Sequence, residues 1–284
     1  MTFPPGSTIP ISFTLLPYLD PLLRVHQGNN QQPDNLCGPY WISLLLQAYG
    51  GLTVTAVEVA IAASTTLPNQ GNPREWLPPN AHSLQGPHYD QIPTQADPSS
   101  CGTAITGLIH ATQTLSQEKF CLIPLQLSPP QLSTWQDGLS TLWSLCHGYP
   151  TWQAIPLLNS HTSYFWGTNP TPHTLISYLQ SKPISSPTTD WSVGHFNLLI
   201  GAVQQNANTL YTLLDTYPQF GWQGLHFQPP DALSQSLHRP QQTTQGGLAL
   251  FLRAEFRSDV EQVVSQNGFK ISGWDNGSPV DVAR

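Results

Sequence analysis

Proline is the residue that most restricts how this chain can fold. Twenty-eight of its 284 residues are prolines, and they are spread along the chain without a period. Because proline lacks a backbone N–H and ends helices, we expect many ordered loops and abrupt element ends rather than a collagen-like or repeat architecture. With 39% hydrophobic residues and nine tryptophans, the chain is not disordered and can bury a substantial core.

The charge pattern argues against one class of partner, nucleic acid. Charged residues make up 9% of the chain, against roughly 25% in typical soluble proteins, so neutral polar groups must provide solubility. A net charge of -7 with only nine Lys and Arg residues argues against a nucleic-acid partner.

Prolines interrupt the first 23 residues, and no basic leader precedes the apolar residues 11–16. We therefore expect neither a signal peptide nor a membrane span, and a cytoplasmic location.

The periodicity predicts an α+β fold in a single domain covering residues 1–284, with helices first and strands later. Residues 67–100, rich in Pro, Asn, Gln and His, are expected to form a long loop excursion of unassigned function. Helices are expected at residues 39–49, 54–63, 102–115, 130–146 and 172–179, and strands at 120–125, 152–158, 195–203, 210–215 and 247–254.

Cys37 is the strongest candidate for a nucleophile. It stands directly before Gly38-Pro39 and a strongly apolar helix, and the free N–H groups and partial positive charge of a helix N-terminus favour a reactive thiolate. The N–H of Cys37 can point into an oxyanion pocket, and Gln31, six positions earlier, can supply a second donor. Gln32 competes with Gln31 for that role.

Cys101 is the rival nucleophile, because it also precedes an expected helix and also follows a glutamine, Gln95, by six positions. It lacks the apolar helix that follows Cys37. The two remaining cysteines, Cys121 and Cys146, are expected to be structural. No CxxC pair is present, so we expect free thiols and neither a zinc site nor another cofactor.

A base for the thiol is expected at His195, which opens an apolar strand after Gly194. The turn residues 206–208 predict an antiparallel hairpin, and the second strand then returns Asp215 to the side of His195. Asp215 can orient the imidazole and stabilise its charged form, as the third member of a catalytic triad does. Asn197 is a weaker alternative, because it lies along the same strand as His195.

The segment Gln31-Gln32-Pro33-Asp34-Asn35-Leu36-Cys37-Gly38-Pro39, followed by Gly194-His195-Phe196 and Leu214-Asp215, resembles papain-like cysteine peptidases. It is most similar to the bacteriocin-processing, double-glycine-leader branch, in which Gln, Cys, His and Asp occur in this order. The resemblance implies a papain-like fold, with Gln31 as oxyanion donor, Cys37 as nucleophile, His195 as base and Asp215 as the residue that orients it.

The function expected from these residues is cleavage of a peptide or protein substrate through a thioester, and the resemblance implies removal of a leader in peptide maturation. No cofactor is needed. Two alternatives stay open: an acyltransferase or peptide ligase that uses the same site, and a catalytically silent peptide-binding module. The oligomeric state is not readable from the sequence.

Overall fold

The main sheet of this computed structural model has eight strands among the described residues, 10–29, 31–69, 71–167, 170–240 and 243–278. Its strands follow the order β10-β4-β9-β5-β6-β7-β8, β1 adds to β6, and every pairing is antiparallel. The strands are β1 (Ser12–Leu15), β4 (Phe120–Leu127), β5 (Ile155–His161), β6 (Gly194–Gln205), β7 (Asn208–Leu214), β8 (Leu225–Gln228), β9 (Gly247–Arg253) and β10 (Phe269–Ile271).

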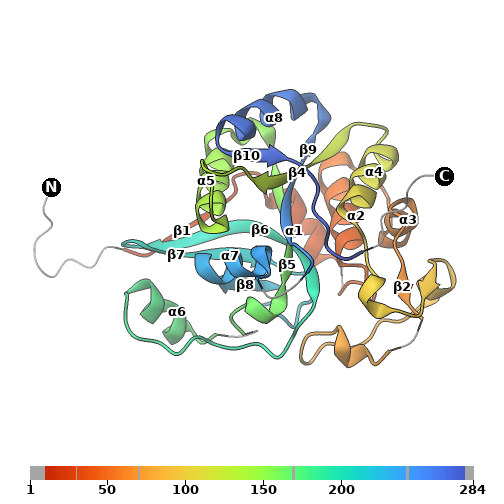
Figure 1. Cartoon of the computed structure of the whole chain (residues 1–284), viewed down its shortest axis with the longest axis horizontal. Helices are drawn as coiled ribbons and strands as arrows, with labels where there is room; N and C mark the ends of the chain where they lie inside the picture. The colour runs from red at the N-terminus through yellow and green to blue at the C-terminus, as the bar shows by residue number, and fades with distance from the viewer. Residues whose placement is uncertain (1–9, 30, 70, 168–169, 241–242, 279–284) are drawn as a thin grey trace, which may run out of the picture.

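Helices cover both sides of this sheet (Figure 1). On one side lie α1 (Asp20–Gln27), α2 (Cys37–Gly50), α3 (Ala56–Ala62) and α4 (Ile105–Leu115). On the other side, α7 (Pro230–His238) packs on β5 and against α5 (Trp135–Gly148). Two further helices are α6 (Pro172–Leu179), beside β7, and α8 (Arg257–Gln266), beside β10. The expected α+β class is confirmed.

Strands β4 and β5 lie between helices, which confirms the strands predicted at residues 120–125 and 152–158. In the main sheet three strands were not predicted: β1, which precedes the first helix, β8 and β10. The prediction that Cys101 opens a helix is wrong: α4 begins at Ile105, and its N-cap is Ala104. No helix in the described part of the chain is long and apolar enough to cross a membrane.

Helix α2 is the centre of the helical layer. Nine consecutive residues, from Gly38 to Leu46, are buried, as expected for a helix that is apolar on all its faces. It ends at its C-cap, Gly51, which takes a left-handed conformation (φ 64°) and whose N–H bonds the carbonyls of Gln47 and Leu46. The helix packs against β6.

The predicted hairpin is confirmed as β6 and β7. Their register pairs Gln205 with Asn208, and the left-handed φ of Asn206 (56°) makes the two-residue turn. At the other end Leu198 pairs with Leu214, so the residue after β7, Asp215, returns to the start of β6.

The excursion at residues 67–100 is held against the segment that precedes α2. Its short parallel strands β2 (Leu67–Pro68) and β3 (Thr94–Gln95) pair with each other. The buried Asp34 carboxylate accepts hydrogen bonds from the Ser83 hydroxyl (2.6 Å) and the Leu84 N–H (2.8 Å). These charge-assisted bonds fix the excursion as one wall of a cleft.

Candidate active site

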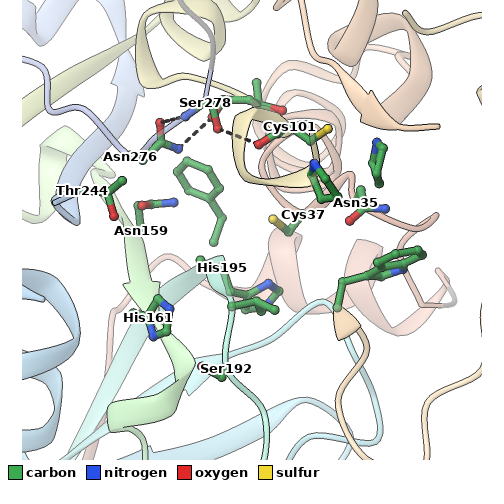
Figure 2. A pocket seen from close by; sticks show the side chains of 18 of the residues that line it. Asn35, Cys37, Cys101, Asn159, His161, Ser192, His195, Thr244, Asn276 and Ser278 are labelled. Atoms are coloured by element: carbon green, nitrogen blue, oxygen red, sulfur yellow. Dashed lines mark hydrogen bonds between the residues drawn. The ribbon is translucent and has the colours of Figure 1, made fainter. Parts of the chain in front are cut away.

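A cleft of about 540 Å³ opens where the start of α2, the start of β6 and the excursion meet. Cys37 and His195 both line it (Figure 2). Its size is within the range of small-ligand sites, about 300–1,000 Å³. Asn35 lies to one side of the Cys37 sulfur, and Asn159 and Thr244 lie to the other.

Two contacts hold the first turn of α2 against β6. The indole Nε1 of Trp41 donates to the carbonyl oxygen of Phe196 at 3.0 Å. Gly38 allows the close approach, since a Cβ built there would lie 3.1 Å from the Phe196 ring. Because Phe196 follows His195, these contacts set the position of the Cys37 thiol relative to the imidazole.

His195 and Asp215 form a buried pair. The imidazole Nε2 lies 2.9 Å from Oδ2 and 3.1 Å from Oδ1 of Asp215, and the two side chains are 3% and 0% exposed. Cys37 lines the same cleft as His195, and the nearness of its thiol is one of the causes that raise the pKa of this imidazole. The structure thus brings Cys37, His195 and Asp215 together at the wall of the cleft.

The charges in this pair stabilise each other. Burial alone would lower the pKa of His195, but the Asp215 carboxylate and the Cys37 contact outweigh burial and raise this pKa to about 10. Burial alone would raise the pKa of the Asp215 carboxyl, but the positive charge on His195 holds it well below its usual range. The imidazole is therefore held in its charged form at neutral pH.

The Asp215 carboxylate is fixed from other directions too. The backbone N–H of Tyr217 donates to Oδ1 at 2.9 Å, and the buried His226 ring places its Nε2 3.7 Å from Oδ2. The Trp191 ring lies over the imidazole of His195, with 4.8 Å between the ring centroids. These neighbours exclude water from the pair and restrict the orientation of the imidazole.

The sequence assigned the oxyanion donor to Gln31, but the glutamine at the wall of the cleft is Gln32. Gln31 does not line the cleft; its Nε2 donates to the carbonyl oxygen of His82 at 2.6 Å, on the outside of the excursion. Gln32, the weighed alternative, is buried and lines the cleft. Its Nε2 donates to the Tyr217 hydroxyl at 3.0 Å, and its Oε1 accepts from the Thr216 hydroxyl at 2.5 Å.

The rival residues are not arranged in this way. Cys101 lines the same cleft, but its Sγ contacts the carbonyl oxygen of Asp97 at 3.4 Å, and burial raises the pKa of this thiol. Asn197 is fully buried, and within the described residues neither polar atom of its side chain has a hydrogen-bond partner. The aspartate, not Asn197, contacts His195. Cys121 and Cys146 are buried, and all four thiols are free.

In the described ranges, no group of three or more His, Cys, Asp or Glu side chains is placed to hold a metal ion.

Comparison with known families matches residues 16–275 to the profile of a family described as a family of unknown function, DUF6885. The chain belongs to the DUF6885 family. The range matched to the DUF6885 family includes Cys37, His195 and Asp215. No curated protein matches the sequence.

Sequence reasoning missed two neighbours of the pair in this DUF6885 protein. His226 is one of them: β8 pairs with β7 and places His226 opposite Leu213, beside Asp215. A glycine-rich turn before an alternating segment, residues 221–228, was the available signal for a third strand. Trp191 precedes β6 in a Pro/Ser/Thr loop, and no local pattern marked it.

Gly38 provides a test of the approach of α2 to β6. In Gly38→Ala, the new Cβ would lie 3.0 Å from Leu108 Cδ1 and 3.1 Å from Phe196 Cδ2, so these packed side chains must give way. We expect the free energy of unfolding to fall by about 1–3 kcal/mol, measured by urea denaturation. Gly148→Ala is the matched control, because nothing lies within 4 Å of a Cβ at this helical glycine. Equal stabilities of the two variants would contradict the close approach.

Proposed function

We propose that this DUF6885 protein is a cysteine peptidase of papain-like type in which Cys37 attacks the carbonyl carbon of a peptide bond. The observation that supports the proposal is the chain of contacts from thiol to imidazole to carboxylate at the wall of an open cleft. A nucleophile that contacts a base, itself oriented by a third group, is the arrangement that covalent catalysis requires. An imidazolium beside a thiol favours the thiolate, which is the reactive form.

The proposed reaction has two halves. The Cys37 thiolate adds to the carbonyl carbon, and the C–N bond then breaks while the imidazolium of His195 gives its proton to the leaving amine. The acyl group is left as a thioester on Cys37. Water, deprotonated by the now neutral imidazole, adds to the thioester, releases the acid and restores the thiolate. Asp215 keeps the imidazole in the orientation that both proton transfers need.

The negative oxygen formed at each addition requires hydrogen-bond donors. The backbone N–H groups of Cys37 and Gly38 are among the first of α2, which have no partners inside the helix. Gln32 takes the donor role that the sequence assigned to Gln31, because Gln32 lines the same cleft as Cys37. Its Nε2 donates to the Tyr217 hydroxyl and, at 3.3 Å, to the Pro33 carbonyl, so it reaches the oxyanion by giving up the longer bond to Pro33. Its links to Thr216 and Tyr217 tie this donor to the segment that carries Asp215.

The substrate class proposed is a peptide, with leader removal in peptide maturation as the specific role. The order Gln, Cys, His, Asp supports this class through its resemblance to leader-removing peptidases. The cleft is open to solvent and has the excursion as one wall, where Trp76 and Glu75 line it. A peptide can therefore lie against side chains on both sides of Cys37.

The test is incubation of the full-length protein with a mixture of peptides, followed by mass spectrometry of the products. New peptide ends are expected with the parent protein and with Cys101→Ser, and at least about 10³-fold fewer with Cys37→Ser. Cleavage that is lost with Cys101→Ser and kept with Cys37→Ser would overturn the assignment. Products that form only when an amine is added, with the amine attached, would make the protein an acyltransferase instead. Absence of any product would favour the binding module.

A further inference from the structure

A buried cation lines the same cleft. Arg239 follows α7 in a left-handed conformation (φ 52°), and its side chain returns into the molecule, so that the residue is only 2% exposed. The guanidinium lies beside the first residue of β6, since a Cβ built on Gly194 would be 3.8 Å from Nη2. Arg239 therefore stands next to the strand end that carries His195.

Neutral groups are the partners of this guanidinium. Nη2 donates to the carbonyl oxygen of Asn159 at 3.3 Å and to the side-chain Oδ1 of the same residue, and Nη1 donates to the Thr244 hydroxyl at 3.3 Å. In the described part of the chain, Nε has no hydrogen-bond partner, and no carboxylate lies within ion-pair distance of Arg239. Hydrogen bonds to neutral oxygens leave the positive charge uncompensated.

A buried charge without a counter-ion is costly, and proteins rarely keep one without a use. Burial lowers the pKa of Arg239 to about 10, which still leaves the side chain charged at neutral pH. His161 lines the same end of the cleft, and burial together with the Arg239 charge lowers its pKa to about 4. This imidazole is neutral at pH 7, so Arg239 is the charge that this end of the cleft presents.

We propose that Arg239 binds a carboxylate of the substrate, on the leaving-group side of the bond that Cys37 attacks. The proposal rests on the proposed function for its direction along the cleft. His195 must reach the leaving nitrogen to protonate it. Arg239 lies beside Gly194, the residue directly before His195 at the start of β6. The candidate oxyanion donors, by contrast, lie at the start of α2. The planar guanidinium fork matches a carboxylate, and a carboxylate supplies the missing negative charge.

Two kinds of carboxylate occur in a peptide, and they would give the enzyme different specificities. A free C-terminal α-carboxylate would make the protein remove residues from the end of a chain. An Asp or Glu side chain would make it cut before an acidic residue inside a chain. Both would meet the same guanidinium, so the experiment includes one arm for each.

The experiment measures binding to full-length Cys37→Ser protein, so that no catalysis is needed. The probes are three pools of N-acetyl dipeptides: free C-terminal carboxylates with neutral side chains, the same peptides as carboxamides, and carboxamides with Asp or Glu as the last residue. Affinities are measured by saturation-transfer NMR titration. We expect one of the two anionic pools to bind at least about tenfold more tightly than the neutral pool. We also expect Arg239→Gln in this background to remove the difference.

Arg253→Gln is the matched control, because Arg253 is half exposed, outside the cleft, and pairs only loosely with Glu255. Arg253→Gln should keep the full preference for the anionic pool. Arg239→Lys, which keeps the charge but not the planar guanidinium, should keep part of this preference. If Arg239→Gln does not fold, the comparison of the three pools on the Cys37→Ser protein still decides. Equal affinity for anionic and neutral pools, or a preference that persists in Arg239→Gln, would overturn the proposal.

The outcomes separate this proposal from the proposed function. Carboxylate preference in the binding assay, with no peptide cleaved by the parent protein, would support Arg239 as the carboxylate-binding residue of a peptide-binding module and contradict the peptidase proposal. Cleavage by the parent protein without any carboxylate preference would contradict only the role proposed for Arg239.

Discussion

Replacing His195 by alanine is expected to slow the alkylation of Cys37 by iodoacetamide at pH 7 by about 100-fold. The imidazole is held charged by Asp215 and contacts the thiol, so its loss removes the group that stabilises the thiolate. The rate is measured by quenching samples over time and quantifying the labelled Cys37 peptide by mass spectrometry.

Cys101 is an internal control in every one of these samples. It lines the same cleft, but its Sγ donates to the Asp97 carbonyl oxygen and Gln95 is its side-chain neighbour, so its slower labelling should not depend on His195. His161→Ala is the matched variant, because it removes another cleft imidazole that is neutral at this pH. Labelling of Cys37 at the rate of Cys101, indifferent to His195, would show that the two side chains do not act together.

The parts of the site that the sequence predicted depend on short-range geometry. The nucleophile position follows from Cys37-Gly38-Pro39 at the start of an apolar helix, and the pairing of His195 with Asp215 follows from a two-residue turn that returns the end of β7 to the start of β6. Each requires only the periodicity of one element and the chemistry of one turn.

The rest of the site depends on how distant segments pack. Gln31 and Gln32 are adjacent, so their spacing from Cys37 does not distinguish them; in the structure Gln31 donates to His82, and Gln32 donates to Tyr217. Arg239 has no motif at all, and only the return of its side chain from the end of α7 toward Asn159 brings it to the cleft.

The largest effect on stability is expected for Asp215→Asn, measured in a Cys37→Ser background so that the His195–Asp215 pair alone is compared. Below pH 6.5 the variant should lose about 3–5 kcal/mol in free energy of unfolding, because it leaves His195 buried without its counter-ion. The pair with Asp215 should be most stable there: the Asp215 carboxylate raises the pKa of His195 above its usual 6.5, so the contribution is complete below pH 6.5 and is lost as the pH rises through the raised pKa.

The difference between the two proteins should therefore shrink by up to about 1.4 kcal/mol per pH unit as the pH rises from 6.5 through the raised pKa of His195, the limit for one proton. Neighbouring groups do not titrate in that window. Burial lowers the pKa of His226 and raises the pKa of Tyr217 well above its usual value of 10. Asp215 itself titrates only in acid, because its pKa is depressed. Urea unfolding at half-unit pH intervals measures the difference. Parallel curves would mean that the imidazole is neutral in the folded protein, and the thiol would then lack the charged partner on which the proposed chemistry depends.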